Sequence, residues 1–290
     1  MLLARRVSLP VAALLDRDAA LSYVAGDSVK FKLSAGTDKS KLTLPQHLAT
    51  QVARAAITGM RTPFLGVQSA SDLRNAILGR ARSAVDLDGV LEYCWEGLGV
   101  PVLPVSTFPA GSVKMDGLAT NIDGRPVIVI SKAATQPAWL LFILAHEIGH
   151  IGSGHVGMNQ TLVDSDVDKT QDQDVEEDQA NAYAALLLRG ADAKAVPKRL
   201  MKAETLLTNA KALGVAQGID PGHLILSYAR DKGAKGGSFW GVATKALKLL
   251  SPNADGPKTM RDRLQKHLDW SALSDDVGEY IRRMTGIDAA

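Results

Sequence analysis

The feature that most constrains this 290-residue chain is an apolar stretch, residues 138–151, that contains the pentapeptide HEIGH. His146 and His150 are four residues apart, so they project from the same face of a helix, whose turn takes about 3.6 residues. Imidazole is the commonest protein ligand of Zn²⁺, and this spacing lets both rings reach one ion. Glu147 follows the first histidine and can act on a water in an open coordination position. The stretch predicts a zinc site on a buried helix, with Glu147 as general base.

A site with two histidines needs a third protein ligand, and a later acidic helix offers one. Residues 175–188, VEEDQANAYAALLL, have one apolar face and begin with acidic side chains, as a helix N-terminus favours. Both Glu176 and Glu177 have suitable chemistry. Glu177 is favoured because Asn181 lies one turn further along the same face, where its side-chain oxygen can accept the N–H of a ligand histidine. The sequence therefore predicts one Zn²⁺ per chain, with Glu177 as third ligand and Glu176 as the alternative.

Three further side chains are candidates for supporting roles. His155 falls one residue short of the spacing HExxHxxGxxH that the three-histidine zinc proteases require, so we expect it beside or behind the ligands. Tyr183 on the ligand helix and His223 early in a later helix could donate a hydrogen bond in the transition state. A lone histidine in a helix is more often structural.

The segment between the two metal-binding stretches is strongly acidic. Asp164, Asp166 and Asp168 imitate the start of an EF-hand loop. Lys169 and Val175 stand where that loop needs glycine and glutamate, which argues against a calcium site. We expect residues 163–178 to begin as an acidic loop beside the cleft.

The remaining periodicity predicts an α+β fold with a small mixed sheet packed against helices. Residues 1–67 form an N-terminal segment of uncertain role, residues 68–190 the metal-binding domain and residues 191–290 a helical C-terminal region. Asp123-Gly124 favours a tight turn in a hairpin over residues 117–130, and a strand beside the HEIGH helix could offer an edge to an extended peptide. The other predicted strands are 26–33 and 100–105, and the other predicted helices are 11–15, 46–60, 71–81, 87–98, 196–213, one beginning at 220–221, 238–250, 257–270 and 274–285.

Residues 145–150 (AHEIGH), followed by EDQANAYA at 177–184, resemble the ImmA/IrrE family of zinc metallopeptidases. That family pairs HExxH with a later E-x-x-A-N/D-x-F/Y-A helix, and the resemblance extends over residues 68–189. It implies a gluzincin-like minimal metalloprotease that cleaves a helix-turn-helix repressor or antitoxin-type partner in a stress or prophage circuit. The chain departs from the family at Arg189, where a proline is common, and at Gln179, where a further glutamate is common.

Composition narrows the compartment and the competing functions. A hydrophobic content of 46% and a charged content of 22% are typical of a soluble globular protein. The single cysteine, Cys94, excludes an internal disulfide and fits a reducing cytosol, and no apolar run approaches the roughly 20 residues that span a bilayer. We expect a cytoplasmic protein without a membrane anchor. Two alternatives remain: a non-catalytic zinc-containing module that binds a repressor or toxin–antitoxin partner, and a DNA-binding protein acting through residues 1–62. The intact Glu147 favours the enzyme, and the absence of a recognition helix makes direct nucleic-acid binding unexpected.

Overall fold

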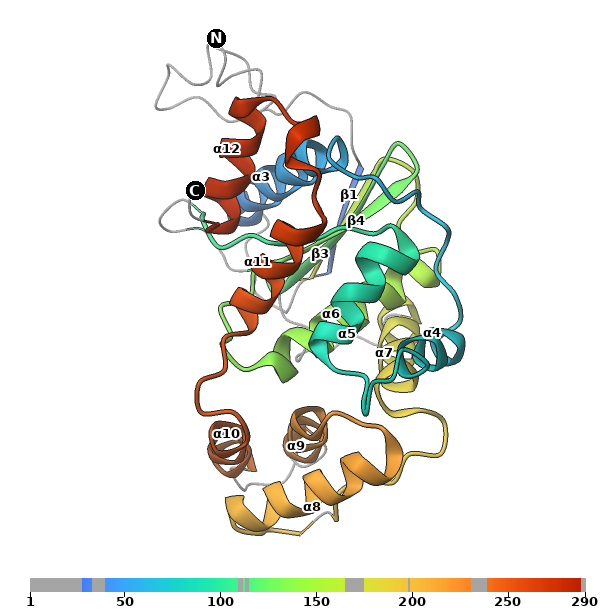
Figure 1. Ribbon diagram of the computed structural model, residues 1–290, viewed down its shortest axis with the longest axis vertical. Helices are drawn as coiled ribbons and strands as arrows, with labels where there is room; N and C mark the ends of the chain where they lie inside the picture. The colour runs from blue at the N-terminus through green and yellow to red at the C-terminus, as the bar shows by residue number, and fades with distance from the viewer. Residues whose placement is uncertain are drawn as a thin grey trace.

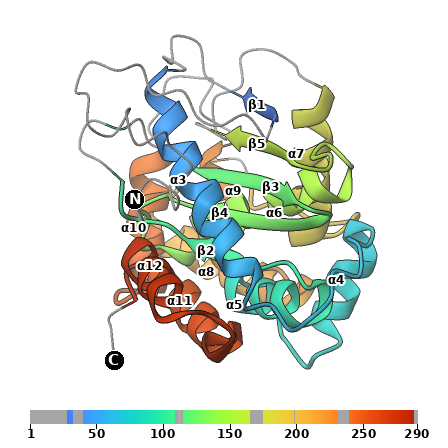
Figure 2. The ribbon, with the colours of Figure 1, turned by 90° about the horizontal axis from the view of Figure 1, so that it is seen from above.

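A computed structural model of the protein describes residues 28–32, 40–108, 112, 115–164, 175–197, 199–230 and 239–287. A five-stranded mixed sheet carries helices on both faces, and a group of three helices lies beyond one of these layers (Figures 1 and 2). The predicted α+β class is confirmed.

The strand order of the sheet is β1-β5-β3-β4-β2. Strands β3 and β4 form the predicted antiparallel hairpin, and its turn residues Asp123 and Gly124 have φ values of 51° and 87°. Asparagine, aspartate and glycine are the residues that tolerate this left-handed backbone. β5 pairs antiparallel with β3, whereas β1 pairs parallel with β5 and β2 pairs parallel with β4. The strands are β1 (Ser28–Lys32), β2 (Val102–Pro104), β3 (Gly117–Ile122), β4 (Arg125–Ile130) and β5 (Gln160–Asp164).

Both faces of the sheet are buried, because successive strand residues point to opposite sides. Ile128 and Ile130 of β4 join a core cluster with helix α6 (Pro137–Gly152). Val127 and Val129 join a second cluster with helix α3 (Ser40–Ile57), which crosses the other face in Figure 2. This double burial explains why residues 126–130 read as a continuous apolar run, PVIVI.

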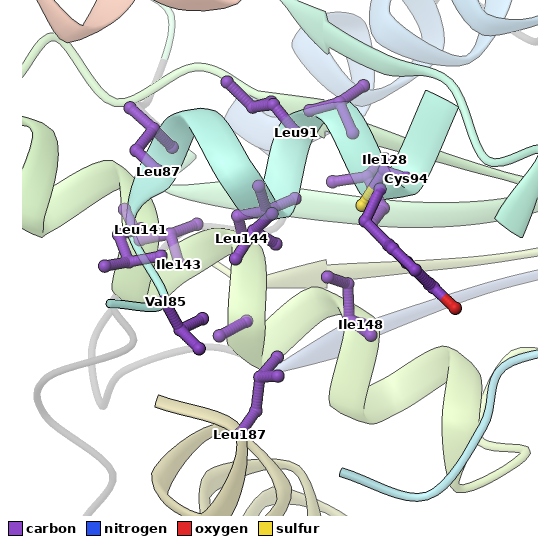
Figure 3. Close-up of a cluster of buried hydrophobic side chains, with 14 of the residues drawn as sticks. Val85, Leu87, Leu91, Cys94, Ile128, Leu141, Ile143, Leu144, Ile148 and Leu187 are labelled. Atoms are coloured by element: carbon purple, nitrogen blue, oxygen red, sulfur yellow. The ribbon is translucent and has the colours of Figure 1, made fainter. Parts of the chain in front are cut away.

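The α6 side of the core holds the helix that carries the HEIGH sequence. Figure 3 shows Leu87 and Leu91 of α5 above Leu141, Ile143 and Leu144 of α6. Cys94 lies in the same cluster and is buried, as expected of a small apolar side chain, and burial raises the pKa of its thiol. The helices on this side are α4 (Ala70–Leu78), α5 (Leu87–Tyr93) with its π-helical continuation η1 (Cys94–Leu98), and α7 (Val175–Arg189).

The C-terminal helices divide between two neighbours. Helices α8 (Ala203–Gln217), α9 (Pro221–Arg230) and α10 (Phe239–Leu250) form their own cluster against Ala138 and Trp139 at the start of α6, as their position below α6 in Figure 1 shows. Helices α11 (Gly256–His267) and α12 (Asp275–Thr285), joined by the 3₁₀ turn η2 (Trp270–Ala272), return to the sheet and pack with α3. The division into domains at residues 67 and 190 stays a prediction.

Several sequence predictions were wrong in detail. The predicted helix 196–213 is α8, which begins at Ala203 and continues through Gly214 to Gly218, whose φ of 62° ends it. Strand β5 was not predicted, because only two adjacent residues of its sequence, QTLVD, are apolar. β3, which contacts α6, is paired on both sides, so it offers no free edge to a peptide. The predicted helix 11–15, most of the acidic segment and its EF-hand alternative lie outside the described residues.

Candidate metal centre

Helix α6 presents the two histidines from inside the core. Pro137 opens the helix, where its missing N–H costs no hydrogen bond. Every residue from Leu140 to His150 is buried, and both histidines are 0% exposed. Their Nε2 atoms face each other at 2.9 Å, so the predicted four-residue spacing does bring the two rings together.

Helix α7 adds one carboxylate to this pair, and it is that of Glu177. Its Oε2 lies 3.4 Å from Nε2 of His146, and its Oε1 lies 3.4 Å from Nε2 of His150. Ligand atoms of the three residues all lie within 4.8 Å of one another, and all three side chains are buried. Glu176 is half-buried and is not part of this group.

The donor set fits a divalent metal ion. Among the described residues, no donor hydrogen-bonds to Oε1 of Glu177, although the atom is buried. A buried carboxylate oxygen without a donor is costly unless a cation is nearby, and two facing imidazole nitrogens suit the same ion. Two imidazoles and one carboxylate are a ligand set of catalytic zinc sites with an open fourth position.

Two glycines, which the sequence motifs do not single out, shape the centre. A Cβ on Gly149, in the middle of HEIGH, would lie 2.7 Å from the carbonyl oxygen of Ala180, so α6 and α7 approach closely there. A Cβ on Gly117, the first residue of β3, would lie 2.1 Å from Oε1 of Glu147. The carboxylate of Glu147, which is 0% exposed, therefore packs against the backbone of β3 at a position that has no side chain. A glycine inside a helix and a glycine opening a strand were the available signals.

The second ring nitrogen of each histidine also has a partner. Nδ1 of His146 lies 3.1 Å from Oδ1 of Asn181, as the sequence predicted for that asparagine. Nδ1 of His150 lies 2.9 Å from Nδ1 of His155, whose Nε2 is 2.8 Å from Oε1 of Gln179. His155 therefore contacts the candidate ligand His150 and is not one of the three residues His146, His150 and Glu177 that could hold the metal ion.

Residues 99–218 match the family model of Peptidase_M78, described as the IrrE N-terminal-like domain. This part of the chain is therefore similar to the ImmA/IrrE family. The matched stretch contains the whole His146–His150–Glu177 group and Glu147, and it supports a metallopeptidase-type role. A search of curated proteins gave no match. Within the described residues, no helix combines the length and apolar character needed to cross a membrane.

The structure places the remaining two candidates, Tyr183 and His223, outside the group of His146, His150 and Glu177. The hydroxyl of Tyr183 donates to the backbone carbonyl of Gln68 at 2.7 Å, and burial raises its pKa. His223 stacks on Phe142 at 6.5 Å between ring centroids, and the centroid of Phe142 lies 6.3 Å from that of His146. A transition-state role for either residue stays a prediction.

His223 should make the protein sensitive to acid. Burial, assisted by Arg189 and Arg230, lowers its pKa from 6.5 to about 3. Because the unfolded state binds the extra proton, this contribution to stability is complete above pH 6.5 and is lost as the pH falls toward 3. Burial raises the pKa of Asp220 from 3.8 to about 6. Its contribution to the free energy of unfolding therefore increases as the pH falls below 6, opposite to that of His223.

We therefore expect the free energy of unfolding of His223→Gln to fall less between pH 7 and pH 4 than that of the unsubstituted protein, by roughly 3 kcal/mol. Urea unfolding at both pH values measures this difference, and the contribution of Asp220 cancels in the comparison. Equal losses in the two proteins would contradict a buried, neutral His223.

Proposed function

We propose that the chain is a zinc-dependent endopeptidase. The observation that carries the proposal is the buried group of His146, His150 and Glu177 inside a stretch that matches a peptidase family. Glu147, the residue that follows His146 in α6, is buried as well. Two imidazoles and a carboxylate leave a fourth coordination position for water or substrate, which is the arrangement of catalytic zinc sites.

The chain's own residues supply the proton transfers of peptide hydrolysis. Zinc, when bound, polarises a carbonyl group and lowers the pKa of a water molecule to about 7. Glu147 would take a proton from the attacking water molecule as the water oxygen bonds to the peptide carbon. The same carboxyl then gives the proton to the leaving nitrogen as the C–N bond breaks. Asn181 and His155 hold the two imidazoles in orientation during these steps.

For the substrate, we propose a helix-turn-helix repressor or an antitoxin-type partner, cleaved in the cytoplasm within a stress or prophage circuit. The support is the similarity of residues 99–218 to the family model, together with the buried single cysteine, which suits a reducing compartment. Cleavage of such a repressor would release its target genes.

Glu147→Gln tests this function. The amide keeps the size of the side chain but cannot accept a proton, so we expect one zinc per chain as in the unsubstituted protein and a loss of cleavage of at least about 100-fold, in line with general acid–base catalysis. Metal analysis of the purified proteins gives the stoichiometry. Proteomics of cells expressing either protein, read for newly formed peptide termini, gives the cleavage.

The same comparison separates the enzyme from a non-catalytic binding module. A module that only binds its partner would give the same termini and the same cellular effect with either residue at position 147. Full activity of Glu147→Gln in cells would therefore exclude the endopeptidase, and less than about one zinc per chain in both proteins would exclude the zinc site.

A further inference from the structure

We propose that Gln179 is a positioning residue of the metal centre, which fixes the orientation and tautomer of His150 through His155. The proposal rests on the zinc site of the proposed function, but it concerns how the chain holds the metal and not what it cleaves. Its basis is an uninterrupted row of contacts: Nδ1 of His150 to Nδ1 of His155 at 2.9 Å, and Nε2 of His155 to Oε1 of Gln179 at 2.8 Å.

Counting protons along this row leaves one arrangement. Nε2 of His150 must be bare to bind a metal ion, so its proton is on Nδ1, which donates to His155. Nδ1 of His155 must then be bare, and its proton is on Nε2. That N–H needs an acceptor, and Oε1 of Gln179 is 2.8 Å away. With the amide reversed, two N–H groups would face each other, so only this orientation satisfies every member.

Helix α7 thus supports both His146 and His150, the first by a direct contact and the second by an indirect one. Asn181 contacts His146 itself, whereas Gln179 reaches His150 through the side chain that follows α6. His155 is 7% exposed, so an unsatisfied N–H there would carry a desolvation cost. An outer partner that fixes the tautomer of a ligand histidine typically changes metal affinity by about 10- to 100-fold.

The outer end of the row is open to solvent. The backbone of Gln179 lies on the exposed side of α7, and the residue helps to line a groove of about 420 Å³ between the N-terminus of α4, the end of α6 and α7. Tyr183 and Leu186 are also in its wall. Gln179 can therefore be replaced without filling a buried space, which makes the row testable from its outer end.

Zinc affinity measured by chelator competition tests the proposal with two substitutions of similar size. Gln179→Met removes the acceptor, and we expect it to weaken zinc binding by about 10- to 100-fold. Gln179→Glu keeps an acceptor oxygen, and we expect an affinity close to that of the unsubstituted protein. Thermal unfolding of the metal-free proteins should still give one cooperative transition for each variant, which shows that a loss of zinc affinity is not a loss of the fold. Equal affinities for the methionine variant and the unsubstituted protein would overturn the proposal.

A double-substitution cycle shows whether Gln179 acts through His155. We expect His155→Ala to weaken zinc binding and Gln179→Met to add nothing further in that background. The visible spectrum of the Co²⁺-substituted protein should change alike in the two single variants, since both release the same ligand ring. Additive effects on affinity would show that Gln179 does not act through His155. These readouts require no substrate, so a protein that binds zinc but cleaves nothing would end the proposed function and leave this inference intact.

Discussion

Glu177→Gln should cost the protein its metal ion. The substitution keeps the shape of the side chain but removes the negative charge that faces Nε2 of His146 and of His150, each at 3.4 Å. An amide oxygen is a poor zinc ligand compared with a carboxylate. We expect zinc affinity to fall by more than the roughly 100-fold that marks the upper range for an outer partner, and peptide cleavage to be lost with it.

The neighbouring residue provides a matched control for this experiment. Glu176→Gln makes the same chemical change one position earlier in the same helix, where the side chain is half-buried and outside the metal-binding group. We expect zinc stoichiometry and affinity to stay at the level of the unsubstituted protein. Chelator competition and metal analysis of both variants decide between the two ligands that the sequence left open. Loss of zinc in Glu176→Gln with retention in Glu177→Gln would reverse the assignment.

The grouping of His146, His150 and Glu177 could be predicted from the sequence because much of its geometry is local to two helices. A four-residue spacing fixes the relation of His146 to His150 whatever surrounds them, and the same spacing relates Glu177 to Asn181. The hairpin was predicted for the same reason, since Asp123-Gly124 specifies its own turn. What remained open was the choice between adjacent glutamates, because neighbouring helix positions differ only in the face that tertiary packing buries.

The supports of the site could not be predicted, because they depend on pairs of residues from separate elements. His155 follows α6, whereas Gln179 lies on α7, and nothing in the sequence shows that the loop after α6 folds back onto the ligand helix. The pairing of β5 with β3 is equally nonlocal, and it turned an expected edge strand into an interior one. Gly117 was overlooked for a related reason: its role is defined by the side chain that covers it.

Gly117→Ala should disable the proposed catalytic step while leaving the metal in place. A methyl group at this position would lie 2.1 Å from Oε1 and 2.9 Å from Cδ of Glu147, and 3.0 Å from Cγ2 of Ile143. Because Glu147 is fully buried, its carboxylate cannot move into solvent and must turn within the site. A displacement of about 1 Å can lower a catalysed rate by about 100-fold, and we expect a loss of cleavage of that order.

Zinc content and stability separate this effect from general damage to the fold. Zinc binding should persist in Gly117→Ala because the side chains of His146, His150 and Glu177 are not among the three nearest contacts of the added methyl group, and overpacking should lower the free energy of unfolding by about 1–3 kcal/mol. Gly278→Ala on α12 is the matched control, since its added methyl group would meet only Trp270 at 4.0 Å. That variant should cleave normally. If Gly117→Ala also cleaves at the normal rate, Glu147 has room to act from another position and the strand does not set its orientation. If zinc is lost as well, β3 holds the ligand helix and not only the general base.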